Sequence, residues 1–592
     1  SVLANHCVGD APSKMVKAHK AKVLARGKKF KFGIRVTFGI KQAMMLDKEN
    51  RNTMWLDATK QELKCLSEWE VFRTLEKGEQ APQGFKQIPH HFVFDVKCDL
   101  RHCARLVVGG NWNVLENNKA HSGVVGMDTV RMGFFIGELN NLNCCAADVS
   151  SACLHGITRE KVHFIAGPEF GELEGRILTV HKSICGLASS GARWHEVMSN
   201  KLQQMGFTPS KTDSDMWIRD RGDHCELIAT HVDDLLVWSR DVTTITKDIQ
   251  DDFHLKNVGP PDCHLGGNVD SLNKHWTKEN VSLGFSAKTH IQNIVPKFED
   301  CFGRQLKTFK TPMLTECHPE VDETPFLGED DASRCRSVIG SLNWLITLGR
   351  FDVHCATNTL SGFNLIPREG HLKAALRVLS HVKTFPKGRT LFDTAHPVFK
   401  DMEDDDCDWK EFYPDAAEEL PPNMLEPKGK PVRITVHLDA DHARDVVTRR
   451  SVTGVLVFLN NTPIRWISKR QRTVETSTCG LELVAARIAT ETVMELRHQL
   501  RMLGVPIDDP SMMHGDNQSV VLNTTVPSSV LKKKWHACSH HRVREAIAGK
   551  IIVFKHISSA KYFADVLTKP LDGNAFHALI EPHLFRNPKW DA

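Results

Sequence analysis

Two short apolar runs flank a pair of acids in the stretch "CELIATHVDDLLVWS", residues 225–239. Apolar runs of this length around a polar pair predict a β-hairpin, with Asp233 and Asp234 at or near its tip. Aspartate favours turns through local hydrogen bonds, so an ordinary Asp-rich turn is one interpretation. Adjacent carboxylates also repel by roughly 4 kcal/mol at ~4 Å and an effective dielectric of ~20, so a bound cation is the other interpretation.

The pattern after residue 430 predicts a compact α/β domain. The stretches "VRITVHLDADHA" and "SVTGVLVFLNNTPIRWIS" have the composition of strands separated by turns. The stretch "ELVAARIATETVMELRHQLRMLG" has apolar residues at helical spacing and predicts a long amphipathic helix that ends at Gly504. Upstream, residues 330–385 are predicted to be mostly helical, and residues 46–300 to mix short strands with helices.

The chain is too long for one hydrophobic core, and its 592 residues suggest three or four domains. The stretch "DMEDDDCDWKEFYPDAAEELPPNMLEPKGK" is acidic, contains proline and has no sustained period, which predicts a linker. The predicted segments are a basic N-terminal segment (1–45), a mixed α/β region (46–300), a mostly helical region (301–400), the acidic linker (401–430), the α/β domain (431–575) and a C-terminal tail (576–592).

Composition and charge narrow the class of protein. A content of 41% hydrophobic and 25% charged residues is typical of a soluble globular protein. The net charge is only +4, so any affinity for nucleic acid has to come from local patches. Residues 14–35 carry nine Lys or Arg and no acid, which fits either a solvated basic tail or an arm that binds a polyanion.

The cysteine pattern indicates an intracellular protein. The chain has 17 Cys, with no CxxC pair and no regular spacing, as expected for reduced thiols and not for a disulfide framework. No apolar run approaches the ~20 residues of a membrane helix, and the first residues lack the apolar core of a signal peptide. The chain starts with Ser, which suggests a fragment or a processed product.

A third acid changes the interpretation of the hairpin. Asp148 follows an apolar run in "NCCAADVSSACLHG", as if at the end of a strand. Three carboxylates that converge from a strand and a hairpin can bind two Mg²⁺, whose charge offsets the repulsion between the acids. Two such ions activate an attacking oxygen and stabilise a leaving oxygen in phosphoryl transfer.

These motifs, in their order along the chain, resemble the Pol polyprotein of copia-type LTR retrotransposons from about residue 30 onward. "WEVFRTLEKGEQAPQGFKQIPHHFVFDVKCDLRHCARLVVGGNW" resembles the fingers of the family's reverse transcriptase, and "DVSSACLHG", "KSICGLASSGARWHEVM" and "HVDDLL" resemble its later polymerase motifs. Residues 335–383 resemble the region between polymerase and RNase H. "HLDADHA", "RRSVTGVLVFLNNTPIRWISKRQ", "GLELVAA", "HGDNQSVV" and "YFADVLTKPL" resemble the RNase H itself.

The resemblance implies an α+β fold, with a right-hand polymerase (fingers, palm and a reduced thumb and connection) followed by an RNase H-like α/β domain. It implies an RNA-directed DNA polymerase in which Asp148, Asp233 and Asp234 hold two Mg²⁺ while the primer 3′ hydroxyl attacks the α-phosphate of a dNTP. Arg105, in "ARLVV", lies at a fingers motif of the family and would contact the triphosphate. A solvated strand arginine is the competing interpretation of Arg105.

The resemblance also implies a second site built from four acids of distant segments. These acids occupy the family's RNase H positions and are Asp439, Glu482, Asp516 and Asp565. With two Mg²⁺, or with Mn²⁺ instead, they would cut the RNA strand of an RNA–DNA hybrid that is recognised through its backbone and 2′-hydroxyls. Asp441, the second acid of "DAD", is predicted to be a surface residue.

Two basic or histidine-rich motifs remain. In "WHACSHH" the spacing of His536, Cys538, His540 and His541 fits no established zinc pattern, so no zinc site is predicted. The lysines at 532–534 would contact nucleic-acid phosphates or form a solvated loop.

The chain departs from the family mainly at tyrosine positions. It has 2 Tyr against 31 His and 17 Cys. The positions at which relatives carry Tyr are occupied by Cys185, His231, Cys335, Cys355 and His381. Each change needs one base transition, which indicates directional substitution, from genomic bias or from decay of a copy that is no longer selected.

Two departures fall in the polymerase site, although neither site loses an acid. Cys153 stands where the family has a bulky Phe or Tyr that excludes the ribose 2′-hydroxyl of the incoming nucleotide. His231 replaces a Tyr before "VDD" that helps to hold the template–primer.

Three hypotheses follow from the sequence. The first is an active polymerase and nuclease whose partners are an RNA template, a DNA primer, RNA–DNA hybrid and dNTPs, with no membrane and with self-association left open. The second is a decayed or repurposed copy that binds nucleic acid without catalysis. The third is a host nuclease that uses only the C-terminal site. The family resemblance implies a cytoplasmic particle or the nucleus as the location, and protease, integrase and Gag segments upstream in a full polyprotein.

Overall fold

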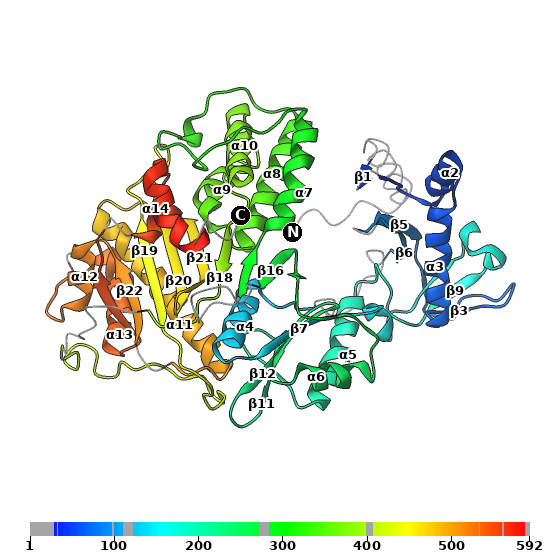
Figure 1. Cartoon of the computed structure of the whole chain (residues 1–592), viewed down its shortest axis with the longest axis horizontal. Coiled ribbons are helices and arrows are strands. Elements are labelled where there is room, and N and C mark those ends of the chain that lie inside the picture. Colours follow the sequence, from blue (N-terminus) through cyan, green and yellow to red (C-terminus); the bar gives the residue numbers. More distant parts are fainter. Residues whose placement is uncertain are drawn as a thin grey trace. The chain divides into compact units, whose positions relative to one another are not determined.

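The structure is a computed structural model of the whole chain (Figure 1). It describes residues 29–31, 34–97, 100–109, 122–271, 283–397, 407–507, 510–531, 533–558 and 562–585. The described chain forms two compact units. One contains the chain up to Val124 together with Val149–Gly206, and the other contains Val125–Asp148 together with the chain from Phe207 onward. None of the helices in the described part is both long and apolar enough to cross a membrane.

In its described residues, the first unit combines a small sheet, two hairpins and three α-helices. Its sheet has the order β3 (Phe72–Thr74), β9 (Ile177–Val180), β8 (Val162–Ile165) and β4 (Lys86–Gln87). Its hairpins are β1 (Lys29–Lys31) with β2 (Ile34–Val36) and β5 (His90–Val96) with β6 (His102–Val108). Its helices are α2 (Ile40–Asn50), α3 (Met54–Glu68) and α5 (Ser190–Gln204), with the short 3₁₀ helices η2 (Ala152–His155) and η3 (Pro168–Leu173). The helix α3 packs on β6, where Glu62 accepts a hydrogen bond from the Leu106 amide.

A six-stranded sheet forms the first part of the second unit. Its order is β10 (Thr208–Pro209), β11 (Met216–Asp220), β12 (Cys225–His231), β13 (Asp234–Ser239), β7 (Asn143–Val149) and β14 (Leu255–Gly259). The helices α4 (Met127–Leu139) and α6 (Val242–Gln250) contact β13. Gly133 and Gly137 let α4 approach closely, because a Cβ at either position would lie 2.8 Å or 2.6 Å from the buried ring of Trp238.

The region that follows is mostly helical, as predicted for residues 330–385. It contains the four-stranded sheet β15 (Cys263–His264), β16 (Gly267–Ser271), β17 (Leu283–Ser286) and β18 (Arg389–Leu391). Its helices are α7 (Lys288–Phe302), α8 (Glu329–Thr347), α9 (His354–Ser361) and α10 (Glu369–Thr384), with the 3₁₀ turns η4 (Pro319–Val321) and η5 (Phe351–Val353). Arg350 donates two hydrogen bonds to the carboxylate of Asp352, and both side chains are almost fully buried.

The C-terminal part is a five-stranded sheet with helices, seen in yellow to red in Figure 1. The order is β21 (Thr462–Arg470), β20 (Val452–Leu459), β19 (Ile434–Ala440), β22 (Ser511–Gly515) and β23 (Ile552–His556). The first three strands are antiparallel, whereas β19–β22 and β22–β23 are parallel pairs. The helices are α11 (Thr478–Met502), α12 (Gln518–Thr525), α13 (Ala537–Ala548) and α14 (Gly573–Leu584), with the 3₁₀ turns η6 (Lys534–His536) and η8 (Phe563–Leu567).

The predicted long helix is present as α11. Its last helical residue is Met502, and Gly504 follows with φ +68°, a left-handed conformation that glycine adopts without strain. The Ser477 hydroxyl caps the other end by accepting a hydrogen bond from the Gly480 amide. The predicted end of this helix at Gly504 is therefore confirmed.

The acidic segment has no helix or strand over residues 407–430, but it is anchored by charged contacts. Glu418 accepts hydrogen bonds from Arg497 and Arg501 of α11. Lys428 donates to Asp220 of β11 at 2.7 Å. The domain boundaries given above stay predictions, and residues 1–28 of the basic segment, 401–406 of the acidic segment and 586–592 of the tail lie outside the described residues.

Candidate metal centres

The acidic hairpin has the predicted form. Strands β12 and β13 pair antiparallel, with His231 opposite Asp234, and Val232 and Asp233 form the turn between them. Val232 has φ +57°, a left-handed conformation that is rare for a β-branched residue and indicates a constrained turn. The next strand pairing places Asp234 directly opposite Asp148 on β7. The sheet register therefore brings two of the three predicted acids face to face.

The carboxyls of Asp148 and Asp234 share a hydrogen bond. Partial burial, this hydrogen bond and the negative charges of Asp233 and Asp148 raise the pKa of Asp234 to about 7. Asp148 also accepts a hydrogen bond from the Asn257 side chain. Asp233 is exposed at the turn. An acid pair that holds a proton near neutral pH is one that a cation would bind in exchange for that proton.

Three residues near these acids were not predicted. Asn257 approaches Asp148 from β14, while Cys263 and His264 belong to β15. Burial and the nearby charge of His231 lower the pKa of His264 to about 4, and Asp148 opposes this shift. These contacts depend on strands distant in sequence, and no local motif marked them.

Arg105 and Cys153 belong to the first unit, apart from the unit that carries the acids. Arg105 is exposed on β6 and hydrogen-bonds the Cys185 thiol. Burial raises the pKa of Glu62, and the positive charge of Arg105 opposes this rise. Cys153 lies half-buried in η2. Contacts of Arg105 with a triphosphate, of Cys153 with a sugar and of His231 with a template–primer stay predictions.

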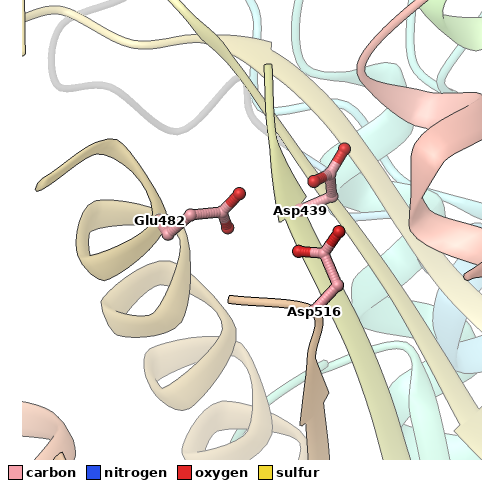
Figure 2. A group of neighbouring side chains, drawn as sticks. All are labelled: Asp439, Glu482 and Asp516. Carbon is pink, nitrogen blue, oxygen red and sulfur yellow. The ribbon is translucent and has the colours of Figure 1, made fainter. Parts of the chain in front are cut away.

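Three of the four C-terminal acids meet at one edge of the sheet. Asp439 lies on β19, Asp516 follows β22 directly, and Glu482 lies in the first turns of α11. Because β19 and β22 are parallel neighbours, their carboxyl ends reach the same edge. One oxygen from each carboxylate lies within 4.8 Å of the other two. Figure 2 shows Glu482 pointing from its helix toward the two aspartates.

The environment of Glu482 is that of a cation ligand. Burial and the charges of Asp439 and Asp516 raise the pKa of Glu482 well above its usual value. One oxygen accepts a hydrogen bond from the Ala440 amide at 3.3 Å. The other is buried and has no hydrogen-bond partner among the described residues. Clustered carboxylate oxygens are the ligands that Mg²⁺ and Mn²⁺ prefer, so these residues fit such an ion.

The fourth acid, Asp565, is held by a lysine that was not predicted. The Lys569 Nζ lies 2.8 Å from Asp565 Oδ1 and 3.8 Å from Asp439 Oδ2. Burial and the charge of Asp439 raise the pKa of Asp565 to about 7, although Lys569 opposes the shift. Thr568 donates a hydrogen bond to Asp439. Thr568 and Lys569 belong to the "YFADVLTKPL" motif, and the four-residue spacing of Lys569 from Asp565 was a usable signal.

The prediction that Asp441 is a surface residue is wrong. Its side chain is buried, with a residue exposure of 5%. The carboxylate accepts hydrogen bonds from the Val452 and Arg444 amides and so closes the loop between β19 and β20. Burial raises the pKa of Asp441 to about 6. Asp441 therefore shapes the loop beside the acids.

The side chains of the "WHACSHH" motif point to different partners. His536 faces Glu475 at 3.4 Å, and His540 hydrogen-bonds the Asn523 carbonyl. His541 Nδ1 and the Tyr413 hydroxyl share a hydrogen bond of 2.6 Å. Of the lysine run, Lys533 donates to the hydroxyls of Thr476 and Ser477. Lys532 lies outside the described residues, and a phosphate contact of this run stays a prediction.

Residues 73–313 match the family described as reverse transcriptase (RNA-dependent DNA polymerase). The chain is 24% identical over 486 residues to the retrovirus-related Pol polyprotein from transposon RE1 of Arabidopsis thaliana, with 80% of this chain and 30% of that protein covered. It is 23% identical over 541 residues to the retrovirus-related Pol polyprotein from transposon TNT 1-94 of Nicotiana tabacum, with 88% and 37% covered. The chain thus spans about a third of the length of these curated relatives.

Among solved structures, the foamy viral protease-reverse transcriptase dRH in complex with ds DNA matches 86% of this chain and 70% of that chain. The identity is 11% and the TM-score 0.45. The α+β fold class expected from the sequence is confirmed, with a six-stranded sheet that carries the acidic hairpin and a five-stranded C-terminal sheet. The motif order and the hairpin make this chain similar to the Pol polyproteins of copia-type transposons, and its residues 73–313 match the reverse transcriptase family.

Proposed function

We propose that the chain is an RNA-directed DNA polymerase with ribonuclease H activity that uses two divalent ions at each site. The observation that carries the polymerase assignment is the pairing of Asp234 with Asp148 across neighbouring strands, beside the turn that presents Asp233. The match of residues 73–313 to the reverse transcriptase family supports the same assignment.

At the polymerase site, Asp148, Asp233 and Asp234 would hold the ions. Mg²⁺ bound there supplies positive charge that stabilises the negative charge developing on the transferred phosphate. The strand pairing holds Asp148 and Asp234 in a fixed arrangement, and ions bound by them would help to orient the primer 3′ hydroxyl toward the dNTP α-phosphate. The hydroxyl oxygen forms the new bond to the α-phosphorus, the hydroxyl proton passes to solvent water, and the bond from the α-phosphorus to the leaving pyrophosphate breaks. The substrates are an RNA template, a DNA primer and dNTPs.

At the C-terminal site, Asp439, Glu482, Asp516 and Asp565 would hold Mg²⁺ or Mn²⁺ and cleave the RNA strand of an RNA–DNA hybrid. The close grouping of three carboxylates supports this assignment, as does the buried Glu482 oxygen that has no hydrogen-bond partner among the described residues. Water attacks the scissile phosphate, and the 3′ oxygen of the preceding nucleotide leaves. The hybrid is recognised through backbone and 2′-hydroxyl contacts, which do not depend on base sequence.

Incorporation of dNTPs on a homopolymer RNA template with a DNA primer tests the polymerase assignment. The full chain should extend the primer in Mg²⁺, and an Asp148→Asn chain should not. Binding of template–primer without extension by the unmodified chain would favour the second hypothesis, a copy that binds nucleic acid without catalysis. The departures at Cys153 and His231 are the observations that favour that alternative.

A further inference from the structure

The lysine beside the C-terminal acids is built into the site. Lys569 lies one helical turn after Asp565, and its backbone amide donates to the Asp565 carbonyl at 3.2 Å. Its ammonium lies 2.8 Å from Asp565 and 3.8 Å from Asp439. Pro570 follows and restricts the backbone at this point. The backbone therefore fixes the position of the Lys569 Cα. The ammonium can move only by rotation of the side chain.

The four acids fall into two groups. Asp439, Glu482 and Asp516 approach within 4.8 Å of one another, and one buried oxygen of Glu482 has no hydrogen-bond partner in the described part of the chain. Asp565 is not a member of this close group, and its carboxylate faces the Lys569 ammonium. Asp439 belongs to both groups, because it also faces Lys569 and accepts a hydrogen bond from Thr568.

We propose that Lys569 is an internal counter-cation that competes with a divalent ion for the carboxylates of Asp439 and Asp565. One ion binds the Asp439–Glu482–Asp516 group, and a further ion binds at Asp565 only when the ammonium moves away. This inference rests on the proposed nuclease function of the same residues, and it adds a residue that sets how many ions bind and how tightly.

The chemistry of lysine suits this role. The side chain is 37% exposed, so it can swing into solvent on its four-carbon stem. One positive charge offsets part of the repulsion between Asp439 and Asp565, which stabilises the domain when divalent ions are scarce. A divalent ion carries twice the charge and displaces the ammonium once its concentration is high enough. The second ion should therefore bind more weakly than the first.

Titration of the full chain with Mn²⁺, without nucleic acid, tests the proposal by calorimetry. The unmodified chain is compared with Lys569→Met, which removes the charge, and with Lys569→Arg, which keeps it. Lys550→Met is the matched control, since Lys550 is an exposed lysine of the same domain. Ions at the polymerase site contribute equally to all four chains. Lys569→Met should bind one of its ions about tenfold more tightly than the unmodified chain, and the other two variants should not.

Thermal unfolding gives a second readout for a variant that folds poorly. In EDTA, Lys569→Met should unfold at a lower temperature than the unmodified chain. The rise in Tm on adding Mn²⁺ should be larger for Lys569→Met than for the unmodified chain. The proposal would be overturned if Lys569→Met and the unmodified chain bound Mn²⁺ with equal affinity and showed equal Mn²⁺-induced rises in Tm. Hybrid cleavage is measured separately on the unmodified chain. Mn²⁺ binding that responds to Lys569→Met without any cleavage would contradict the nuclease function and leave the role of Lys569 supported.

Discussion

Replacing Asp234 by Asn should stabilise the hairpin at high pH while it removes polymerase activity. The pKa of Asp234 is raised from 3.8 to about 7 in the folded chain. A raised carboxyl pKa contributes stability that is fully present below pH 3.8 and is lost as the pH rises to about 7. Above that range the folded chain bears two facing carboxylates, Asp148 and Asp234, which repel.

The size of this effect follows from the pKa shift. A change from 3.8 to about 7 corresponds to ~4 kcal/mol, which we reduce to ~2 kcal/mol because solvent screens a half-buried carboxylate. Asn has the shape of Asp and no charge, so Asp234→Asn should stabilise the hairpin by ~2 kcal/mol at pH 8. Near pH 4 the two chains should differ little.

Hydrogen exchange of the strands β12 and β13 in EDTA measures this effect locally. At pH 8 the Asp234→Asn chain should exchange about 30-fold more slowly than the unmodified chain, because local opening costs more free energy. Asp233→Asn is the matched control, since that acid is exposed at the turn. It should also abolish dNTP incorporation, but its exchange should change less. Equal hydrogen-exchange rates of β12 and β13 in the unmodified chain and in Asp234→Asn at pH 8 would refute the argument from charge repulsion.

Three further changes test other parts of the structure. Cys153→Phe should strengthen discrimination against rNTPs in primer extension if Cys153 leaves room at the ribose 2′ position; a strong dNTP preference unchanged by the substitution would show that another residue selects the sugar. Glu482→Gln should abolish hybrid cleavage and leave hybrid binding within a few fold, measured by fluorescence anisotropy, because binding depends on backbone contacts; cleavage at the unmodified rate would remove Glu482 from the site. Asp352→Asn should destabilise the second unit by ~3 kcal/mol in urea unfolding, because it leaves the buried Arg350 guanidinium without its charged partner; a loss below ~1 kcal/mol would contradict that.

Helices and strands were most predictable from the sequence where apolar residues recur along one face with a clear period. The helix α11 carries a long amphipathic pattern, a capping serine and a terminal glycine, so its type and its end at Gly504 were predictable. The acidic hairpin was predictable because apolar runs flank a two-residue turn. In both cases the information lies within about 25 consecutive residues.

Burial at the sheet centre and contacts between distant strands were not predictable. β19 is buried at every position, so Asp439 is not marked by any alternation of exposed and buried residues, and Asp441, which directly follows the strand, is buried as well. The contacts of Asn257 and His264 with the polymerase acids depend on the strands β14 and β15, whose positions follow from tertiary packing. The contact of Lys569 with Asp565 was easier to predict, because the two residues are only four positions apart in the sequence.

One reaction with a labelled RNA template tests both proposed activities at once. The full chain is given a 5′-labelled RNA template, a DNA primer, dNTPs and Mg²⁺, and both the primer length and the RNA length are followed. An active polymerase and nuclease should extend the primer and cleave the RNA behind the growing end, with extension lost in Asp148→Asn and cleavage lost in Glu482→Gln. Cleavage without extension would reduce the chain to a nuclease. A chain that binds the template–primer but produces neither extension nor cleavage would contradict both proposed activities.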